Sequence, residues 1–119
     1  MKIQNYRQVK GITAAPGVTM HIVAGTAEKA PTFVMRVFEI EKGSATPLHT
    51  HPWEHEVFVL EGKGVVKSGG KETPLQAGDT GIVLPNEQHS FMNIGKEMLR
   101  MICVVPLVDG KMPGMPAND

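Results

Sequence analysis

Short apolar segments separated by turn-forming residues limit, more than any other feature, how this chain can fold. Thirteen glycines and nine prolines interrupt the apolar runs, and both residues are typical of turns and loops. No run shows the 3.6-residue period of an amphipathic helix, whereas short apolar runs between turns are typical of strands. The sequence therefore predicts an all-β fold, closed into a sandwich or barrel that protects its strand edges. The predicted strands lie within residues 18–25, 32–41, 54–62, 64–70, 80–85, 89–94 and 97–106.

The length of the chain and the composition of its C-terminal end indicate a single domain. A chain of 119 residues is close to the commonest size of a domain with one core. Residues 108–119 are rich in proline, glycine and polar side chains, which is typical of loosely held termini. We expect one domain over residues 1–119, with its core at about 18–107 and a loose C-terminal tail at about 108–119.

The charge balance narrows the kinds of partner. Twelve basic and twelve acidic side chains give a formal net charge of zero, so nothing indicates a nucleic-acid or membrane-surface partner. No stretch approaches the ~18 apolar residues of a membrane span, and the N-terminal residues lack the apolar core of a signal peptide. We expect a cytoplasmic protein whose partners are small molecules or a second copy of itself, with no nucleic acid and no membrane.

Histidines gather in one short segment, 49–55. His49 and His51 are two residues apart, so an extended backbone places both imidazoles on one face. Three imidazoles this close would repel one another when protonated, and their burial gains little unless a cation uses their lone pairs. The segment therefore predicts a metal site. His21 stands alone, and we expect an ordinary surface or hydrogen-bonded core residue there.

Two spaced motifs contain these histidines and a fourth one, His89. The first combines two glycines with a His-x-His pair, and the second combines a glycine, a proline, a histidine and an asparagine. In this chain the matching residues are Gly43, His49, His51, His55 and Gly62, then Gly78, Pro85, His89 and Asn93. The pattern resembles the cupin superfamily over most of the chain. The resemblance implies a cupin double-stranded β-helix, also called a jelly-roll barrel, with a metal ion inside.

The chain departs from the cupin motifs at informative positions. His55 stands where the family usually has glutamate, and Glu56 would replace it if the motif were aligned one residue later. The alternation of a strand favours His55, because it shares a face with the apolar Val57 while Glu56 points away. In the second motif Leu84 replaces a proline, and Asn86 replaces a glycine. Asparagine tolerates the left-handed backbone that glycine usually supplies there.

More narrowly, the chain resembles small single-domain manganese-containing cupins with four histidine ligands. That resemblance implies one divalent transition metal per chain, manganese first and then iron, nickel, zinc, copper or cobalt. Cys103 is the only cysteine, so a thiolate zinc cluster within one chain is excluded. The expected metal ligands are His49, His51, His55 and His89.

Other residues near the ligands have two interpretations each. Trp53 and Phe91 either line the metal cavity or only pack beside the strands. Cys103 either borders the cavity or serves as a small buried apolar group. Glu54 and Glu56 either orient the imidazoles or remain solvated charges. We expect Trp53, Phe91 and Cys103 to line the pocket.

The expected metal centre allows several functions. Four histidines would leave two adjacent octahedral positions open, and a neutral ligand shell favours an anionic or phenolic molecule there. The resemblance implies a dioxygenase-like oxidoreductase that activates dioxygen or a peroxide to cleave a small phenolic or enolic substrate. A non-redox decarboxylase or isomerase of a small acid, and a non-catalytic binding protein, are the alternatives. No catalytic side chain beyond the metal centre stands out.

Apolar side chains on the outward face of the predicted barrel indicate self-association. Phe58 and Leu60 alternate with the inward residues of their strand, and residues 32–41 are apolar on both faces. An outer apolar face needs a cover. We therefore expect a homodimer that buries Phe58 and Leu60.

Overall fold

Nine strands and two short 3-10 helices form the regular structure of residues 1–114, which is the part of the chain that the computed structural model describes. The all-β prediction is confirmed. The helices are η1 (Tyr6–Gln8) and η2 (Thr26–Glu28), and the strands are β1 (Ile12–Ala15), β2 (Val18–Ala24), β3 (Phe33–Ile40), β4 (His55–Glu61), β5 (Lys63–Ser68), β6 (Lys71–Gln76), β7 (Thr80–Val83), β8 (Ser90–Asn93) and β9 (Leu99–Pro106).

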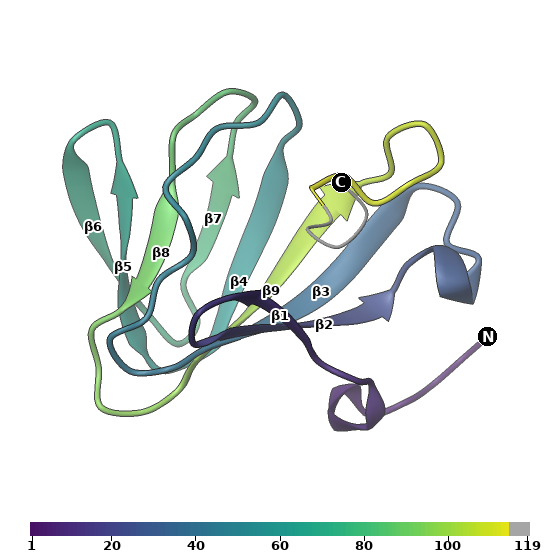
Figure 1. Ribbon diagram of the computed structural model, residues 1–119, viewed down its shortest axis with the longest axis horizontal. Helices are drawn as coiled ribbons and strands as arrows, with labels where there is room; N and C mark the ends of the chain where they lie inside the picture. The colour runs from purple at the N-terminus through teal and green to yellow at the C-terminus, as the bar shows by residue number, and fades with distance from the viewer. Residues whose placement is uncertain (115–119) are drawn as a thin grey trace.

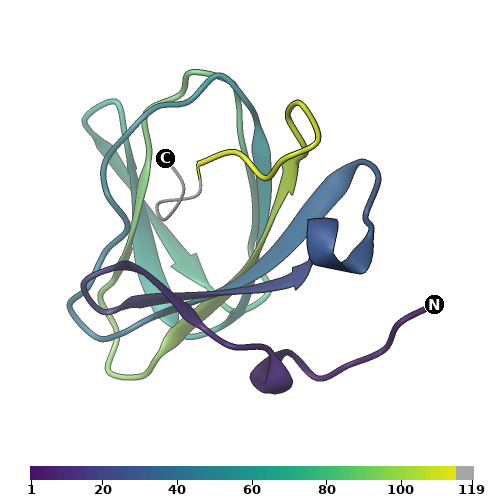
Figure 2. The same cartoon turned by 45° about the vertical axis from the view of Figure 1, so that its right-hand side comes forward.

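The strands form two antiparallel sheets that face each other. The larger sheet has the order β1-β2-β3-β9-β4-β7, and the smaller one has the order β6-β5-β8 (Figure 1). Residues 43–49 run beside β8 and exchange backbone hydrogen bonds with it, so they lengthen the smaller sheet. Figure 2 shows the two sheets curving around a common interior.

Strand alternation decides which residues fill that interior. Along β9 every second residue is buried, so Met101 and Cys103 point inward. Along β4 the inward residues are His55, Val57 and Val59, and the residues between them are exposed. This two-residue period is the usual consequence of a pleated sheet with one covered face. The interior therefore combines an apolar core with the first residue of β4.

Residues of the two motifs hold the turns around this interior. Gly62 has φ +95°, and a Cβ there would lie 2.5 Å from the carbonyl oxygen of Met98, so only glycine fits. Asn86 has φ 65°, the left-handed backbone expected for it. Asn93 is 1% exposed, and its Nδ2 donates to the carbonyls of Ile40 and Glu97 at 2.8 Å each. These residues fix the strand connections.

The outer face of the larger sheet carries exposed apolar side chains. Phe58 is 44% exposed and Leu60 is 40% exposed. Phe58 pairs in register with Ile102 of β9, which itself pairs with Val37 of β3. Apolar groups therefore form a row across this face, which runs from the exposed Phe58 through the half-buried Ile102 to the buried Val37.

The C-terminal residues begin with a small turn. Val108 and Lys111 form an isolated β-bridge, with backbone hydrogen bonds of 2.8 and 3.0 Å. The rest of the expected tail, residues 115–119, lies outside the described residues. Within residues 1–114, no helix is long and apolar enough to cross a membrane.

Candidate metal centre

Backbone pairing brings the first and last expected ligands together. His49 and His89 face each other in an antiparallel bridge, and each backbone N–H donates to the other's carbonyl at 3.1–3.2 Å. Their ring centroids are 4.6 Å apart. His51 lies two residues beyond His49, with ring centroids separated by 5.3 Å. Three of the imidazoles therefore lie beside the smaller sheet. His89 directly precedes β8, and His49 and His51 belong to the connection between β3 and β4.

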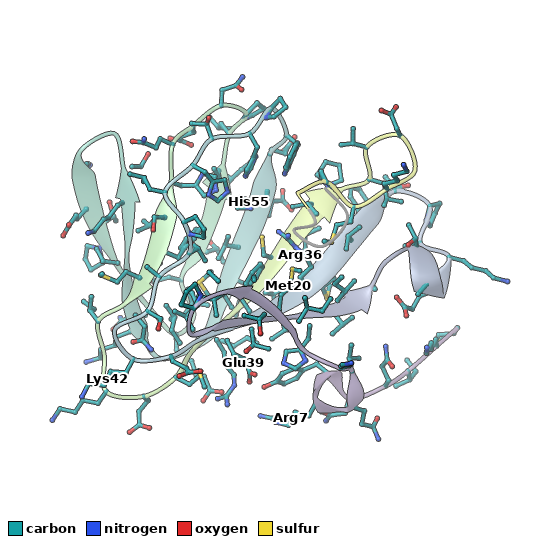
Figure 3. All side chains as sticks on the ribbon, viewed as in Figure 1. Arg7, Met20, Arg36, Glu39, Lys42 and His55 are labelled. Carbon is teal, nitrogen blue, oxygen red and sulfur yellow. The ribbon has the colours of Figure 1, made fainter. Side chains whose placement is uncertain are left out.

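These three imidazoles form a group that can hold a metal ion. One nitrogen of each of His49, His51 and His89 lies within 4.8 Å of the others. His55 is not in that group, but it enters the same space from β4. Its ring centroid lies 4.7 Å from that of His89 and 5.1 Å from that of His51. Figure 3 shows His55 pointing into the interior between the sheets.

Backbone carbonyls orient the three grouped imidazoles. His51 Nδ1 lies 2.7 Å from the carbonyl oxygen of Trp53, and His89 Nδ1 lies 2.8 Å from that of Glu87. His49 Nδ1 faces the carbonyl of Pro47 in the same way. A carbonyl only accepts, so each Nδ1 carries the proton, and a neutral ring then has its lone pair on Nε2. Each ring thus offers Nε2 to a metal.

The fourth imidazole has a different partner. His55 Nδ1 lies 3.1 Å from Cys103 Sγ, and Arg36 Nη2 donates to the same sulfur at 2.9 Å. All three side chains are buried. The Nε2 atoms of His55 and His89 are buried and have no hydrogen-bond partner among the described residues. Buried nitrogens without partners are costly, and a metal ion would satisfy both of them.

Burial keeps His51, His55 and His89 neutral. Burial lowers the pKa of His55 to about 3, and repulsion by His89 and Arg36 adds to the effect. Burial also lowers the pKa of His51 and of His89, although their backbone carbonyl partners partly oppose it. Neutral imidazole is the form that binds a metal. The site is therefore ready for a cation near neutral pH.

An apolar cavity of about 290 Å³ lies against the imidazoles. This volume corresponds to roughly ten water molecules in the liquid, so a small organic molecule fits. Phe91 and Cys103 line the cavity, as do His49, His55 and His89. The other lining residues are Ala14, Val18, Met20, Arg36, Phe38, Thr46, Pro47, Met101 and Gly114.

Some expected neighbours of the ligands have other positions. Trp53 is not among the cavity-lining residues, because its ring stacks on His51 with centroids 4.5 Å apart and an interplanar angle of 5°. Glu54 and Glu56 are exposed, and no hydrogen bond joins either one to an imidazole in the described part of the chain. The imidazoles are therefore oriented by backbone carbonyls and one thiol, and not by the carboxylates of Glu54 and Glu56.

Burial changes the thiol as well. The pKa of Cys103 is raised by burial, which outweighs the opposite effect of the nearby Arg36. The sulfur is therefore a poor nucleophile. The sulfur also makes polar contacts with His55 and Arg36, which a side chain that only fills apolar space would not make.

Arg36 is a charged residue of the cavity that sequence reasoning missed. It is 8% exposed and lies inside the barrel (Figure 3). The signal was the two-residue alternation of β3, which places Arg36 on the face of Val34 and Ile40, both fully buried. A charged residue on that face has to enter the core.

Comparisons with known proteins show what this chain is similar to. The chain is 30% identical to an oxalate-binding protein of Thermotoga maritima over 90% of this chain and 86% of that protein. The structure of the polyketide cyclase RemF from Streptomyces resistomycificus matches with a TM-score of 0.83, at 28% identity over 89% of this chain and 79% of that one.

The chain is also similar to a second solved structure, and it matches a family model. The structure of a predicted oxalate decarboxylase from Thermotoga maritima has a TM-score of 0.75 and 26% identity, over 90% of this chain and all of that one. The model of the Cupin domain family matches residues 36–105, more than half of the chain. The expected cupin jelly-roll fold is thus confirmed, and the chain belongs to the cupin domain family.

Proposed function

We propose that the chain binds one divalent transition metal through Nε2 of His49, His51, His55 and His89, and that it is a metal-dependent oxidoreductase. The observation that carries this proposal is the pair of buried Nε2 atoms of His55 and His89, which have no hydrogen-bond partner in the described part of the chain. Their rings lie against an apolar cavity large enough for a small molecule. Manganese is the first candidate, followed by iron, nickel, zinc, copper or cobalt, because imidazole accepts all of these ions.

The side chains of the site support oxidative cleavage of a carbon–carbon double bond in a small phenolic or enolic substrate. A redox-active metal, when bound, supplies dioxygen activation. The apolar walls, including Met20, Phe38 and Met101, exclude water and hold the unsaturated part of the substrate. Adding both atoms of dioxygen across the cleaved bond gives two carbonyl products, so no further reductant is needed.

Acid–base chemistry has less support. Among the described residues, no aspartate or glutamate lines the cavity, so a carboxylate general base is missing where enolisation or isomerisation would need one. Three of the imidazoles have their Nδ1 protons engaged by backbone carbonyls, and Nδ1 of the fourth, His55, lies against the thiol of Cys103. This arrangement holds ligands in place and leaves little capacity for moving a proton.

Binding of a small acid without redox chemistry is the second candidate. A relative is named as an oxalate-binding protein, and the cavity holds an arginine that no carboxylate of residues 1–114 pairs with. A metal with open positions can polarise or simply retain a carboxylate. This candidate uses the same four histidines and differs in the absence of oxygen consumption.

Metal analysis and oxygen uptake test the proposal. Protein purified without added metal should contain one transition-metal ion per chain, and His89→Ala should contain much less. The manganese-, iron- and cobalt-loaded proteins are then screened for oxygen uptake with phenolic alkenes and enols, with the His89→Ala protein as control. Uptake that is equal in both proteins contradicts a metal-centred reaction. Metal binding without any uptake leaves the small-acid candidate.

We also propose that two chains pair through the outer face of the larger sheet. Phe58 and Leu60 are exposed there beside the row formed with Ile102 and Val37. Burying such a face against a second copy removes apolar area from water. Light scattering at micromolar concentration should report a dimer for the wild type and a monomer or poorly soluble protein for the Phe58→Ser, Leu60→Ser variant. A monomeric wild type contradicts the proposal.

A further inference from the structure

Arg36 carries a positive charge in the cavity that nothing in the described part of the chain neutralises. The side chain is 8% exposed, and no ion pair joins it to a carboxylate among the described residues. Buried arginines are normally paired with an acid, because an unpaired charge in a low-dielectric interior is costly. The absence of a partner among residues 1–114 therefore points to an anion that is not one of the described side chains.

The hydrogen bonds of the guanidinium also remain incomplete. Arginine has five N–H groups. One of them donates to Cys103 Sγ at 2.9 Å, and another has only a long contact of 3.9 Å to the sulfur of Met20. Nε is buried and has no partner. Sulfur is a weak acceptor, so the guanidinium keeps donors for a stronger one.

The surroundings of Arg36 hold its planar group in place beside the metal centre. Its Cζ lies 5.0 Å from the centroid of the Phe38 ring, a distance typical of a cation–π contact. A single sulfur atom, that of Cys103, separates Arg36 from His55. A small molecule in the cavity can therefore touch both the guanidinium and the imidazole cluster.

We propose that Arg36 is an anion-binding residue of the cavity and takes the carboxylate of a small unsaturated acid. A planar guanidinium matches a carboxylate with two parallel hydrogen bonds. The acid offers oxygens to the free N–H groups, and its unsaturated part lies along the apolar wall of Val18, Met20 and Phe38. Binding of the carboxylate by Arg36 does not depend on the proposed oxidoreductase function. Only the reaction at the unsaturated end of the acid rests on that function.

The net charge of the cavity with a metal ion bound also favours an anionic ligand. The cluster is made of neutral imidazoles, so a divalent ion would add two positive charges to that of Arg36, and no carboxylate of the described residues lines the cavity. An anion bound between them relieves this excess. Neutral substrates would leave it uncompensated.

A pair of nearly isosteric probes tests the subsite directly. Binding of 4-hydroxycinnamate and of 4-hydroxycinnamamide is measured by calorimetry at pH 8, with metal-loaded and with chelator-treated protein. The acid should bind at least ~10-fold more tightly than the amide in both forms, since hydrogen bonds to charged groups are the stronger ones. Equal affinity for acid and amide in the metal-free wild type overturns the proposal.

Variants assign the preference to Arg36. Arg36→Met should bind acid and amide within about twofold of each other, and Arg36→Lys should keep only part of the preference because it loses the fork geometry. Methionine suits a buried position, so the variant should fold. Lys67→Met, which removes an exposed positive charge outside the cavity, should keep the full preference. An Arg36→Met protein that still prefers the acid refutes the inference, and if that variant does not fold, the wild-type comparison of the two probes decides alone.

The two proposals fail in different experiments. Preference for the acid in metal-free protein depends on Arg36 and not on the metal, whereas oxygen uptake depends on the metal. Acid preference without oxygen uptake keeps the subsite and removes the oxidoreductase. Oxygen uptake without acid preference keeps the oxidoreductase and removes the subsite.

Discussion

His21 and the histidine cluster show how the same side chain serves two different purposes outside and inside the barrel. His21 lies on β2, where its Nδ1 is 2.8 Å from the carbonyl oxygen of Val9 and its Nε2 is 3.1 Å from Glu39 Oε1. Both nitrogens thus have oxygen partners. In the cluster, Nδ1 of His49, His51 and His89 has an oxygen partner, whereas Nδ1 of His55 lies against a sulfur. Nε2 of His55 and of His89 has no partner among the described residues.

The charges around His21 explain its role. Burial alone would raise the pKa of Glu39, but hydrogen bonds from Arg100, His21 and Tyr6 outweigh it and lower the pKa. Arg100 Nε donates to Glu39 Oε2 at 2.7 Å, and the Tyr6 hydroxyl donates to the same oxygen at 3.0 Å. His21 is therefore one member of a closed polar network. The difference between the two regions lies in the second nitrogen, which decides whether an imidazole supports the fold or can bind a metal.

The largest expected effect separates the two regions by metal content. His89→Ala removes one buried Nε2 from the centre and should weaken metal binding more than ~100-fold, beyond the loss typical of a residue that only orients a ligand. His21→Ala should keep one metal ion per chain. Elemental analysis after dialysis measures both. A His21→Ala protein that loses its metal would break the comparison.

A glutamate in place of His55, the fourth expected ligand, makes the comparison between the two regions more specific. His55→Glu should still bind a metal, because glutamate occupies this position in many cupins, but it adds a negative charge near Arg36. Opposite charges at contact distance attract by about 1–4 kcal/mol, depending on the dielectric, so anionic ligands should bind roughly tenfold more weakly. Calorimetry with a small carboxylate measures the change. Unchanged anion affinity would show that the charge of the ligand shell has no part in recognition.

The lowered pKa values of the cluster predict how stability depends on pH. Unfolded histidines bind protons below about 6.5, whereas His55 in the folded protein does so only near pH 3, and the pKa of His51 and His89 is also lowered. The unfolded state therefore binds more protons in this window, and the free energy of unfolding of metal-free protein falls as the pH drops from about 6.5 towards 3.

Urea denaturation between pH 7 and 5 tests this slope, because most carboxyl groups stay ionised there. The His55→Gln protein should show a shallower slope than the wild type, since it lacks the most strongly shifted group. Equal slopes in both proteins would contradict the assigned pKa of His55. The same protons compete with a metal, so release of the ion should need a lower pH than for ordinary exposed histidines.

The smallest effect concerns the structural histidine. His21→Ala removes hydrogen bonds to Val9 and Glu39 and should lower the free energy of unfolding by about 1–3 kcal/mol. The edge-on contact with Tyr6, at a centroid distance of 5.4 Å, is lost as well. Urea denaturation of metal-free protein measures the change without interference from metal binding. His21→Asn keeps one polar group and should lose less.

The sequence was sufficient for the β-fold and for the inward position of His55, because both depend on strand alternation, whereas the approach of His89 to His49 was expected from the cupin motifs. Alternation along 54–62 placed His55 inward and Glu56 outward without any tertiary information. Motif spacing placed Asn86 in a turn that needs a left-handed residue. These features follow from the local backbone.

Other parts of the site depend on which segments meet. The carbonyls that orient the imidazoles belong to Pro47, Trp53 and Glu87, in irregular segments whose conformation no period predicts. The chain bends at Pro52 and Trp53, and Trp53 stacks on His51, which the expectation of a cavity wall did not include. Arg36 was overlooked because a charged residue in an apolar strand is usually solvated, and only sheet pairing shows which face is covered.

The pairing of residues 43–49 with β8 has a kinetic consequence. Two expected ligands, His49 and His51, lie on the irregular connection between β3 and β4, and that connection is held to β8 by backbone hydrogen bonds such as Thr46 N to Phe91 O at 2.9 Å. An ion held by all four histidines would clamp this connection to β4, so it could leave only when the connection detaches. Metal exchange and amide hydrogen exchange at Thr46 should then share one opening event and have the same rate-limiting step.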